Sequence, residues 1–140
     1  MTIIKALQDF LSGYSGMKLQ KIKTDRPEEE ASSYAVAMSG SGKITKDVVG
    51  NHTYQNSYIF LAREATADEI DRQDNYGFVE GLTEWLEEQN AAGNYPVLPG
   101  GYTVDNIEVA NSMLVDLYDD GTGLYQIQIQ LIIKKRRCAI

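Results

Sequence analysis

One segment of this chain has the residue types of a phosphate-binding loop. Residues 39–43 read Ser-Gly-Ser-Gly-Lys, and glycines before a lysine can let backbone N–H groups approach a phosphate. The full motif also needs a glycine six residues before the lysine and a Ser or Thr directly after it. This chain has Ala37 and Ile44 at those places, and the residues that follow favour a strand over a helix. We therefore interpret the segment as a hairpin turn.

His52 and Cys138 are the only histidine and the only cysteine. A catalytic histidine normally accompanies a Ser or Cys nucleophile and an orienting carboxylate, and no such set is recognisable near His52. Basic neighbours would favour the thiolate of Cys138, but a residue this close to a chain end is not held in place as a nucleophile must be. The sequence predicts no enzyme, no cofactor and no metal site.

The carboxylates occur in short runs such as Glu87-Glu88 and Asp119-Asp120. Adjacent helical residues do not face each other, and the Asp119-Asp120-Gly121 turn lacks the ligand ladder of a calcium loop. We expect these acidic residues to be solvated. The basic run Lys134-Lys135-Arg136-Arg137 has two interpretations. It contacts an acidic partner surface, or it is a solvated end that protects a strand edge from aggregation.

The overall charge limits the range of partners. The chain has 13 basic and 20 acidic residues, a formal net charge of −7, which argues against general nucleic-acid binding. The segment from Glu64 to Glu88 is strongly acidic, in contrast to the basic run near the C-terminus. Copies of such a chain can pair head to tail, and head-to-tail contacts close into rings when the rotation permits.

The elements that position these residues indicate one domain, residues 1–140. Hydrophobic residues make up 43% of the chain, which is ordinary for a globular protein. The apolar runs are shorter than a signal sequence or a membrane span, so we expect neither secretion nor membrane insertion.

Two helices are predicted. The first carries an apolar stripe from Ile3 to Tyr14, with Thr2 as N-cap. The second begins at a capping box, Thr66 to Glu69, and ends at Gly93. Its expected core residues are Ile70, Phe78, Leu82, Trp85 and Leu86.

The remaining apolar runs alternate as strands do. One strand is predicted at Met17–Asp25, and an antiparallel meander at Ser33–Met38, Lys43–Val49 and His52–Arg63, with its first turn at Gly40 and Gly42. Two longer runs follow, joined by a turn at residues 119–123. Their core-facing residues are expected to be Ile107, Val109, Met113, Val115 and Leu117, then Tyr125, Ile127, Ile129, Leu131 and Ile133. The fold class is therefore α+β: a mostly antiparallel sheet, meander plus C-terminal hairpin, covered by two helices.

Two connections are expected to make contacts with partners, because loops on a rigid sheet often do. The first is the loop from Ala91 to Thr103, which contains Tyr95 and Tyr102. The second is the turn with Asp119 and Asp120. Replacing both aspartates with lysine should disturb assembly and leave the thermal midpoint of the monomer nearly unchanged.

The order of elements resembles that of the tail-terminator, or minor capsid, proteins of long-tailed phages and Firmicutes prophages. The similarity lies in the amphipathic start Ile3–Leu11, the strand Tyr58–Leu61, the helix with Phe78, Leu82, Trp85 and Leu86, and the hairpin Gly121–Ile129. It implies a non-catalytic virion protein that assembles in the bacterial cytoplasm. In that family a homo-oligomeric ring, typically a hexamer, caps the tail tube and joins it to head-completion proteins.

Two other interpretations remain open. The chain resembles equally a neighbouring neck or head-closure protein of the virion. Alternatively it is a small α+β ligand-binding or enzymatic domain, with a pocket lined by tyrosines such as Tyr34, Tyr54, Tyr58, Tyr118 and Tyr125.

Overall fold

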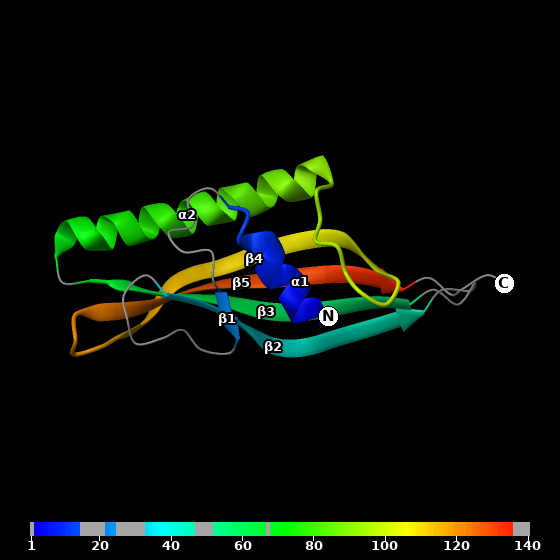
Figure 1. Ribbon diagram of the computed structural model, residues 1–140, viewed down its shortest axis with the longest axis horizontal. Helices are drawn as coiled ribbons and strands as arrows, with labels where there is room; N and C mark the ends of the chain where they lie inside the picture. The colour runs from blue at the N-terminus through cyan, green and yellow to red at the C-terminus, as the bar shows by residue number, and fades with distance from the viewer. Residues whose placement is uncertain (1, 15–21, 25–32, 47–51, 67, 136–140) are drawn as a thin grey trace.

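The computed structural model describes residues 2–14, 22–24, 33–46, 52–66 and 68–135. Its elements are α1 (Ile3–Leu11), β1 (Ile22–Thr24), β2 (Ser33–Lys46), β3 (His52–Ala65), α2 (Glu69–Ala92), β4 (Tyr102–Leu117) and β5 (Thr122–Lys135). The strands form one sheet in the order β1-β2-β3-β5-β4 (Figure 1). Only β1 and β2 are parallel; the other neighbours are antiparallel. The predicted α+β class is confirmed.

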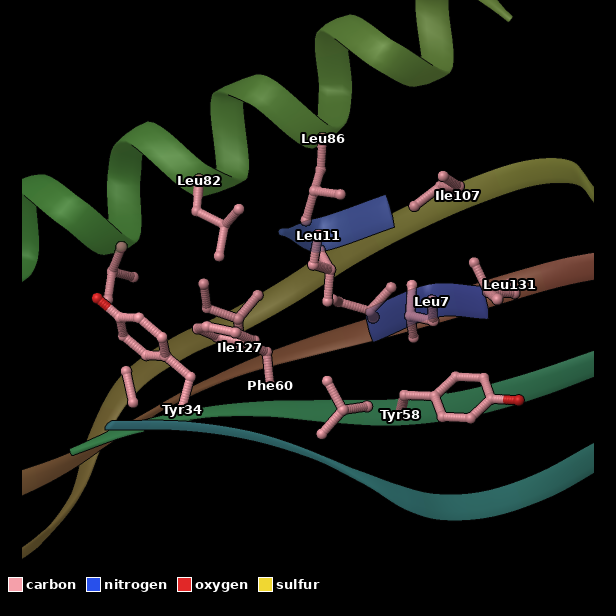
Figure 2. Packing of buried hydrophobic residues seen from close by; sticks show 14 of the residues in the cluster. Leu7, Leu11, Tyr34, Tyr58, Phe60, Leu82, Leu86, Ile107, Ile127 and Leu131 are labelled. Atoms are coloured by element: carbon pink, nitrogen blue, oxygen red, sulfur yellow. The ribbon is translucent and has the colours of Figure 1, made fainter. Parts of the chain in front are cut away.

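Both helices pack on the same face of the sheet, and the core lies between them and the strands (Figures 1 and 2). Leu7 and Leu11 of α1 and Leu82 and Leu86 of α2 are completely buried there. The sheet contributes every second residue of its strands, as the pleat requires. The buried sheet residues of this core are Tyr34, Val36, Tyr58, Phe60, Ala62, Val104, Ile107, Tyr125, Ile127, Ile129, Leu131 and Ile133.

The first helix forms as its sequence predicts. The Thr2 hydroxyl accepts a hydrogen bond from the Lys5 amide at 3.1 Å, so Thr2 is the N-cap. The apolar stripe of α1 packs beside the second helix. There Phe10 lies 5.1 Å from Trp85 between ring centroids, and Tyr14 lies 5.7 Å from the same ring.

The second helix begins two residues later than its predicted cap. Asp68 is the N-cap and accepts a hydrogen bond from the Asp71 amide at 2.8 Å, whereas Thr66 bonds the β4–β5 turn instead. This moves the helical face, so the prediction that Ile70 lies in the core is wrong: Ile70 is 70% exposed. Asn75 and Val79 are buried instead. Gly93 ends the helix in the left-handed conformation, with φ of 72°, as predicted.

The predicted turn at Gly40 and Gly42 is wrong. Residues 33–46 form one strand, β2, which pairs with β3 from Ser33 to Lys46. The register shifts between Met38 and Gly40 and again between Ser41 and Ile44. The glycines therefore mark irregularities of one strand, a common place for glycine in sheets. The predicted meander is thus the hairpin β2–β3, and its turn lies outside the described residues. The predicted strand Met17–Asp25 is described only at Ile22–Thr24.

The predicted core face of β4 holds only for its first half. Three register shifts occur along β4, between Val104 and Asn106, Ala110 and Met113, and Leu114 and Asp116. An extra residue at a bulge reverses which side chains face the core. Leu114 consequently packs against the core opposite Tyr125, whereas Val115 and Leu117 are 48% and 56% exposed.

Candidate interaction surfaces

The β4–β5 turn is fastened to β3 by a group that we call the turn cluster: Arg63, Tyr118, Asp120 and Thr122. Arg63 donates hydrogen bonds to Thr122 Oγ1 at 2.9 Å and to Asp120 Oδ2 at 3.0 Å. Its guanidinium carbon lies 3.9 Å from the centroid of the Tyr118 ring. Only 12% of the Arg63 side chain is exposed. A planar guanidinium suits this combination of stacking and paired donors.

Asp120 is held by the same cluster. Its Oδ1 accepts hydrogen bonds from the Thr122 hydroxyl at 2.6 Å and from the Thr122 amide at 3.1 Å. These bonds, together with the charge of Arg63, lower the pKa of the Asp120 carboxyl below its ordinary value. Asp119 is exposed and is not part of the cluster. The structure thus gives these two adjacent candidate residues different surroundings.

Backbone and side-chain bonds join the turn to the start of α2. The Thr66 amide donates to the Gly121 carbonyl at 2.8 Å. Buried Asn75 donates to the Ala65 carbonyl at 2.7 Å and lies 3.3 Å from the Tyr125 hydroxyl. These partners are 10 and 50 residues away from Asn75 in sequence, which is why sequence patterns did not indicate the contacts. This end of the molecule is therefore built mainly from internal bonds.

The loop between α2 and β4 is also braced. The Tyr95 hydroxyl lies 3.0 Å from Asn90 Oδ1 and 3.2 Å from the Asp105 carbonyl. The same Asn90 oxygen accepts a hydrogen bond from the Ile107 amide at 2.9 Å, which ties the end of α2 to β4. Tyr95 thus positions the loop from within. The loop presents a different apolar side chain to the solvent, Val97, which is 86% exposed.

Tyr102 and the basic run lie at the opposite end of the sheet from the β4–β5 turn (Figure 1). The ring of Tyr102 packs edge-on against Tyr54 at 5.7 Å. Lys134 forms a half-exposed ion pair with Asp105 at 3.5 Å. Lys135 is the last residue of β5, and Arg136 and Arg137 lie outside the described residues. Of the predicted contact residues, the structure therefore brings Tyr102 and Lys134 to one end, and Asp119 and Asp120 to the other.

The tyrosines proposed as pocket residues do not converge. Tyr34, Tyr58 and Tyr125 are buried in the core, where Tyr34 stacks on Phe78 at 5.5 Å (Figure 2). Burial raises the pKa of the Tyr58 hydroxyl. Tyr118 belongs to the turn cluster, and Tyr54 packs between Tyr102 and His52. These side chains fill space between the layers rather than line a common cavity.

Charge is unevenly divided along the chain and therefore over the molecule. Residues 64–120, which end β3 and form α2 and β4, contain fourteen acidic residues and one basic residue, Arg72, for a net charge of −13. The rest of the chain must carry +6 to give the total of −7. The acidic residues of this segment are Glu64, Asp68, Glu69, Asp71, Asp74, Glu80, Glu84, Glu87, Glu88, Asp105, Glu108, Asp116, Asp119 and Asp120.

Four of these carboxylates define what we call the acidic ridge: Glu80, Glu84, Glu87 and Glu88. All four are exposed, and their spacing places them on the outer side of α2. In the described parts of the chain no ion pair involves any of them. The last turn of α2 has no basic residue, so Glu87 and Glu88 lie next to the negative end of the helix dipole. The ridge is therefore unfavourable for the isolated helix.

Comparisons with known proteins give no family: no protein-family model and no curated protein matches this chain. Within the described ranges, no group of His, Cys, Asp or Glu is arranged to hold a metal ion. The helices found there are too short or too polar to cross a membrane.

Proposed function

We propose that this protein is a structural component of the head–tail joining region of a phage or prophage, and specifically a tail terminator. In this role copies assemble into a ring, of six in the family it resembles, that caps the tail tube and meets the head-completion proteins. It acts by contact and not by catalysis. Its place is the virion, and the bacterial cytoplasm during assembly.

The observation that carries the proposal is the division of charge within one protomer. The acidic ridge and the basic run Lys134–Arg137 belong to separate parts of the molecule, so they are complementary between copies. A contact between two different surfaces of identical subunits is head to tail, and such contacts generate rings. An acidic ring also suits a conduit for DNA, because negative walls do not retain phosphates.

The braced loop supports a second contact, with the tail tube. Tyr95 and Asn90 hold the loop in place, so presenting Val97 to a partner costs little ordering entropy. Because this loop and the end of β5 lie at the same end of the sheet, we assign that end to the contact with the tube (Figure 1).

Deleting the gene from its phage or prophage tests the role. The expected result is heads and tails that fail to join, seen by electron microscopy, with joining restored when purified protein is added to the extract. Normal joined virions without the protein would overturn the proposal.

Separating free heads from free tails distinguishes the neck or head-closure alternative. A tail terminator should sediment with purified tails, and an immunogold label should mark the head-proximal end of each tail. Label on the heads alone would assign the protein to the neck.

A further inference from the structure

We infer that the seven residues from Lys134 to Ile140 of one copy bind lengthwise along the outer face of α2 of a second copy. The contact would form the subunit boundary of the proposed ring, so it rests on the proposed function. It joins four basic residues to the acidic ridge, and the apolar residues that follow them to exposed apolar side chains near the start of α2.

The charges are complementary at this contact and are not satisfied elsewhere in the described residues. The acidic ridge contains four exposed carboxylates without an ion pair within the described ranges. The run Lys134-Lys135-Arg136-Arg137 provides four positive charges. Only Lys134 has a described partner, Asp105, in a half-exposed pair that contributes little.

The apolar residues are complementary in the same order. After the basic run, the sequence ends in Cys138-Ala139-Ile140. Before the acidic ridge, α2 exposes two large apolar side chains, Ile70 at 70% and Tyr76 at 44%. A segment running antiparallel to α2 would therefore place basic residues on acidic ones and Ile140 near Ile70 and Tyr76.

The lengths agree as well. Glu80 to Glu88 covers about 12 Å along a helix, and four extended residues cover roughly 13 Å. From the middle of the basic run to Ile140 is about 15 Å of extended chain. From Glu84 to Tyr76 is about 12 Å and from Glu84 to Ile70 about 21 Å. Ile140 would thus lie between Tyr76 and Ile70.

Gly77 is an independent indication of a partner on this face. A glycine inside a helix is destabilising by roughly 0.5–1 kcal/mol relative to alanine. Gly81 has a packing reason, because a Cβ there would collide with the Tyr14 hydroxyl. A Cβ on exposed Gly77 would have nothing within 4 Å. The described fold does not require this glycine, whereas a segment lying close to the helix backbone would.

Folding back of the segment onto the same copy is the competing arrangement. β5 ends at Lys135, at the end of the sheet opposite the β4–β5 turn, and points away from the protomer (Figure 1). The experiment separates the two arrangements directly, because only a contact between copies can be restored by mixing two variants.

The test uses two charge-reversed full-length chains. The helix-reversed chain carries Glu80→Lys, Glu84→Lys and Glu87→Lys; the tail-reversed chain carries Lys135→Glu, Arg136→Glu and Arg137→Glu. Sedimentation velocity at low salt should show association of the unmodified chain and at least about 100-fold weaker association of each variant, because like charges then meet. An equimolar mixture should associate again, since each reversed surface meets an unreversed partner.

Two further variants probe the apolar half. Ile140→Asp and Gly77→Trp should each weaken association about tenfold or more, by losing the apolar contact or filling the space over the helix. Val97→Asp is the matched control, because it alters the most exposed apolar residue outside the contact and should leave self-association unchanged. Unfolding in urea confirms that every variant is folded.

The results separate this inference from the proposed function. The inference is overturned by variants that associate as the unmodified chain does, or by a mixture that does not recover. It is also overturned by an unmodified chain that stays monomeric to millimolar concentration at low salt. The head–tail role is judged separately, by whether the chain sediments with purified tails.

Discussion

The β4–β5 turn and the outer face of α2 are both acidic surfaces, yet they differ in what their carboxylates bind. Asp120 accepts three hydrogen bonds and an ion pair from its own chain, and a guanidinium that is mostly buried lies behind it. The acidic ridge on α2 has no such partners among the described residues. The same residue type therefore supports folding at one place and opposes it at the other, where a partner is the better explanation.

The largest effect that would test this contrast is expected at Arg63. In Arg63→Ala, Asp120 and Thr122 lose their donors and Tyr118 loses its stacked guanidinium. The free energy of unfolding should fall by about 2–3 kcal/mol, as for the loss of a buried charged hydrogen-bond donor. Urea unfolding measures it. Arg63→Lys keeps the charge but not the fork, so it should recover only part of the loss.

Arg72→Ala is the control for Arg63. Arg72 is exposed and donates to the Thr66 carbonyl at 3.0 Å. Its loss should cost less than that of Arg63. Equal losses would mean that the turn cluster is not a special point of attachment.

How far sequence patterns predict this molecule depends on the range of the interaction. The Thr2 cap and the Gly93 stop are local, and both are confirmed. The bulges of β4 depend on pairing with β5, so the faces of Val115 and Leu117 were predicted wrongly. Alternation alone does not reveal an extra residue in one strand.

The candidate contact residues show the same dependence on long-range structure. Asp119 and Asp120 are equivalent as a sequence pair. They differ in the fold because Arg63, 57 residues before Asp120, meets only one of them. Tyr95 is a conspicuous loop aromatic in the sequence, but its hydroxyl is used inside the loop. The exposed Val97 two residues later gives no signal in the sequence, because surface exposure is a property of the folded chain.

A smaller effect is expected from the two aspartates taken separately. Asp120→Asn should destabilise the monomer, and Asp119→Asn should leave it nearly unchanged, because only Asp120 is bonded in the turn cluster. This divides the predicted outcome of the double lysine substitution into a folding part and a contact part. Thermal unfolding measures the first, and sedimentation the second.

The pH dependence of stability provides a further check on Asp120. Its folded-state pKa is lowered, so its contribution to stability is complete above the pKa of the unfolded chain and is lost as pH falls through the folded value. The difference between the unmodified chain and Asp120→Asn should be constant near neutral pH and shrink in acid. A difference that grows in acid would contradict the assigned bonds.

The smallest effect, with the opposite sign, is expected on the acidic ridge. In the double variant Glu87→Gln, Glu88→Gln, two negative charges are removed from the negative end of the α2 dipole. The monomer should gain about 0.3–1 kcal/mol at low salt, and the gain should fade as salt is added. Sedimentation should show weaker self-association of the same variant. Stabilisation with weakened assembly is what separates a ridge kept for a partner from a merely solvated helix face, for which association would not change. Loss of stability would instead show that these carboxylates, like Asp120, are bonded within their own chain.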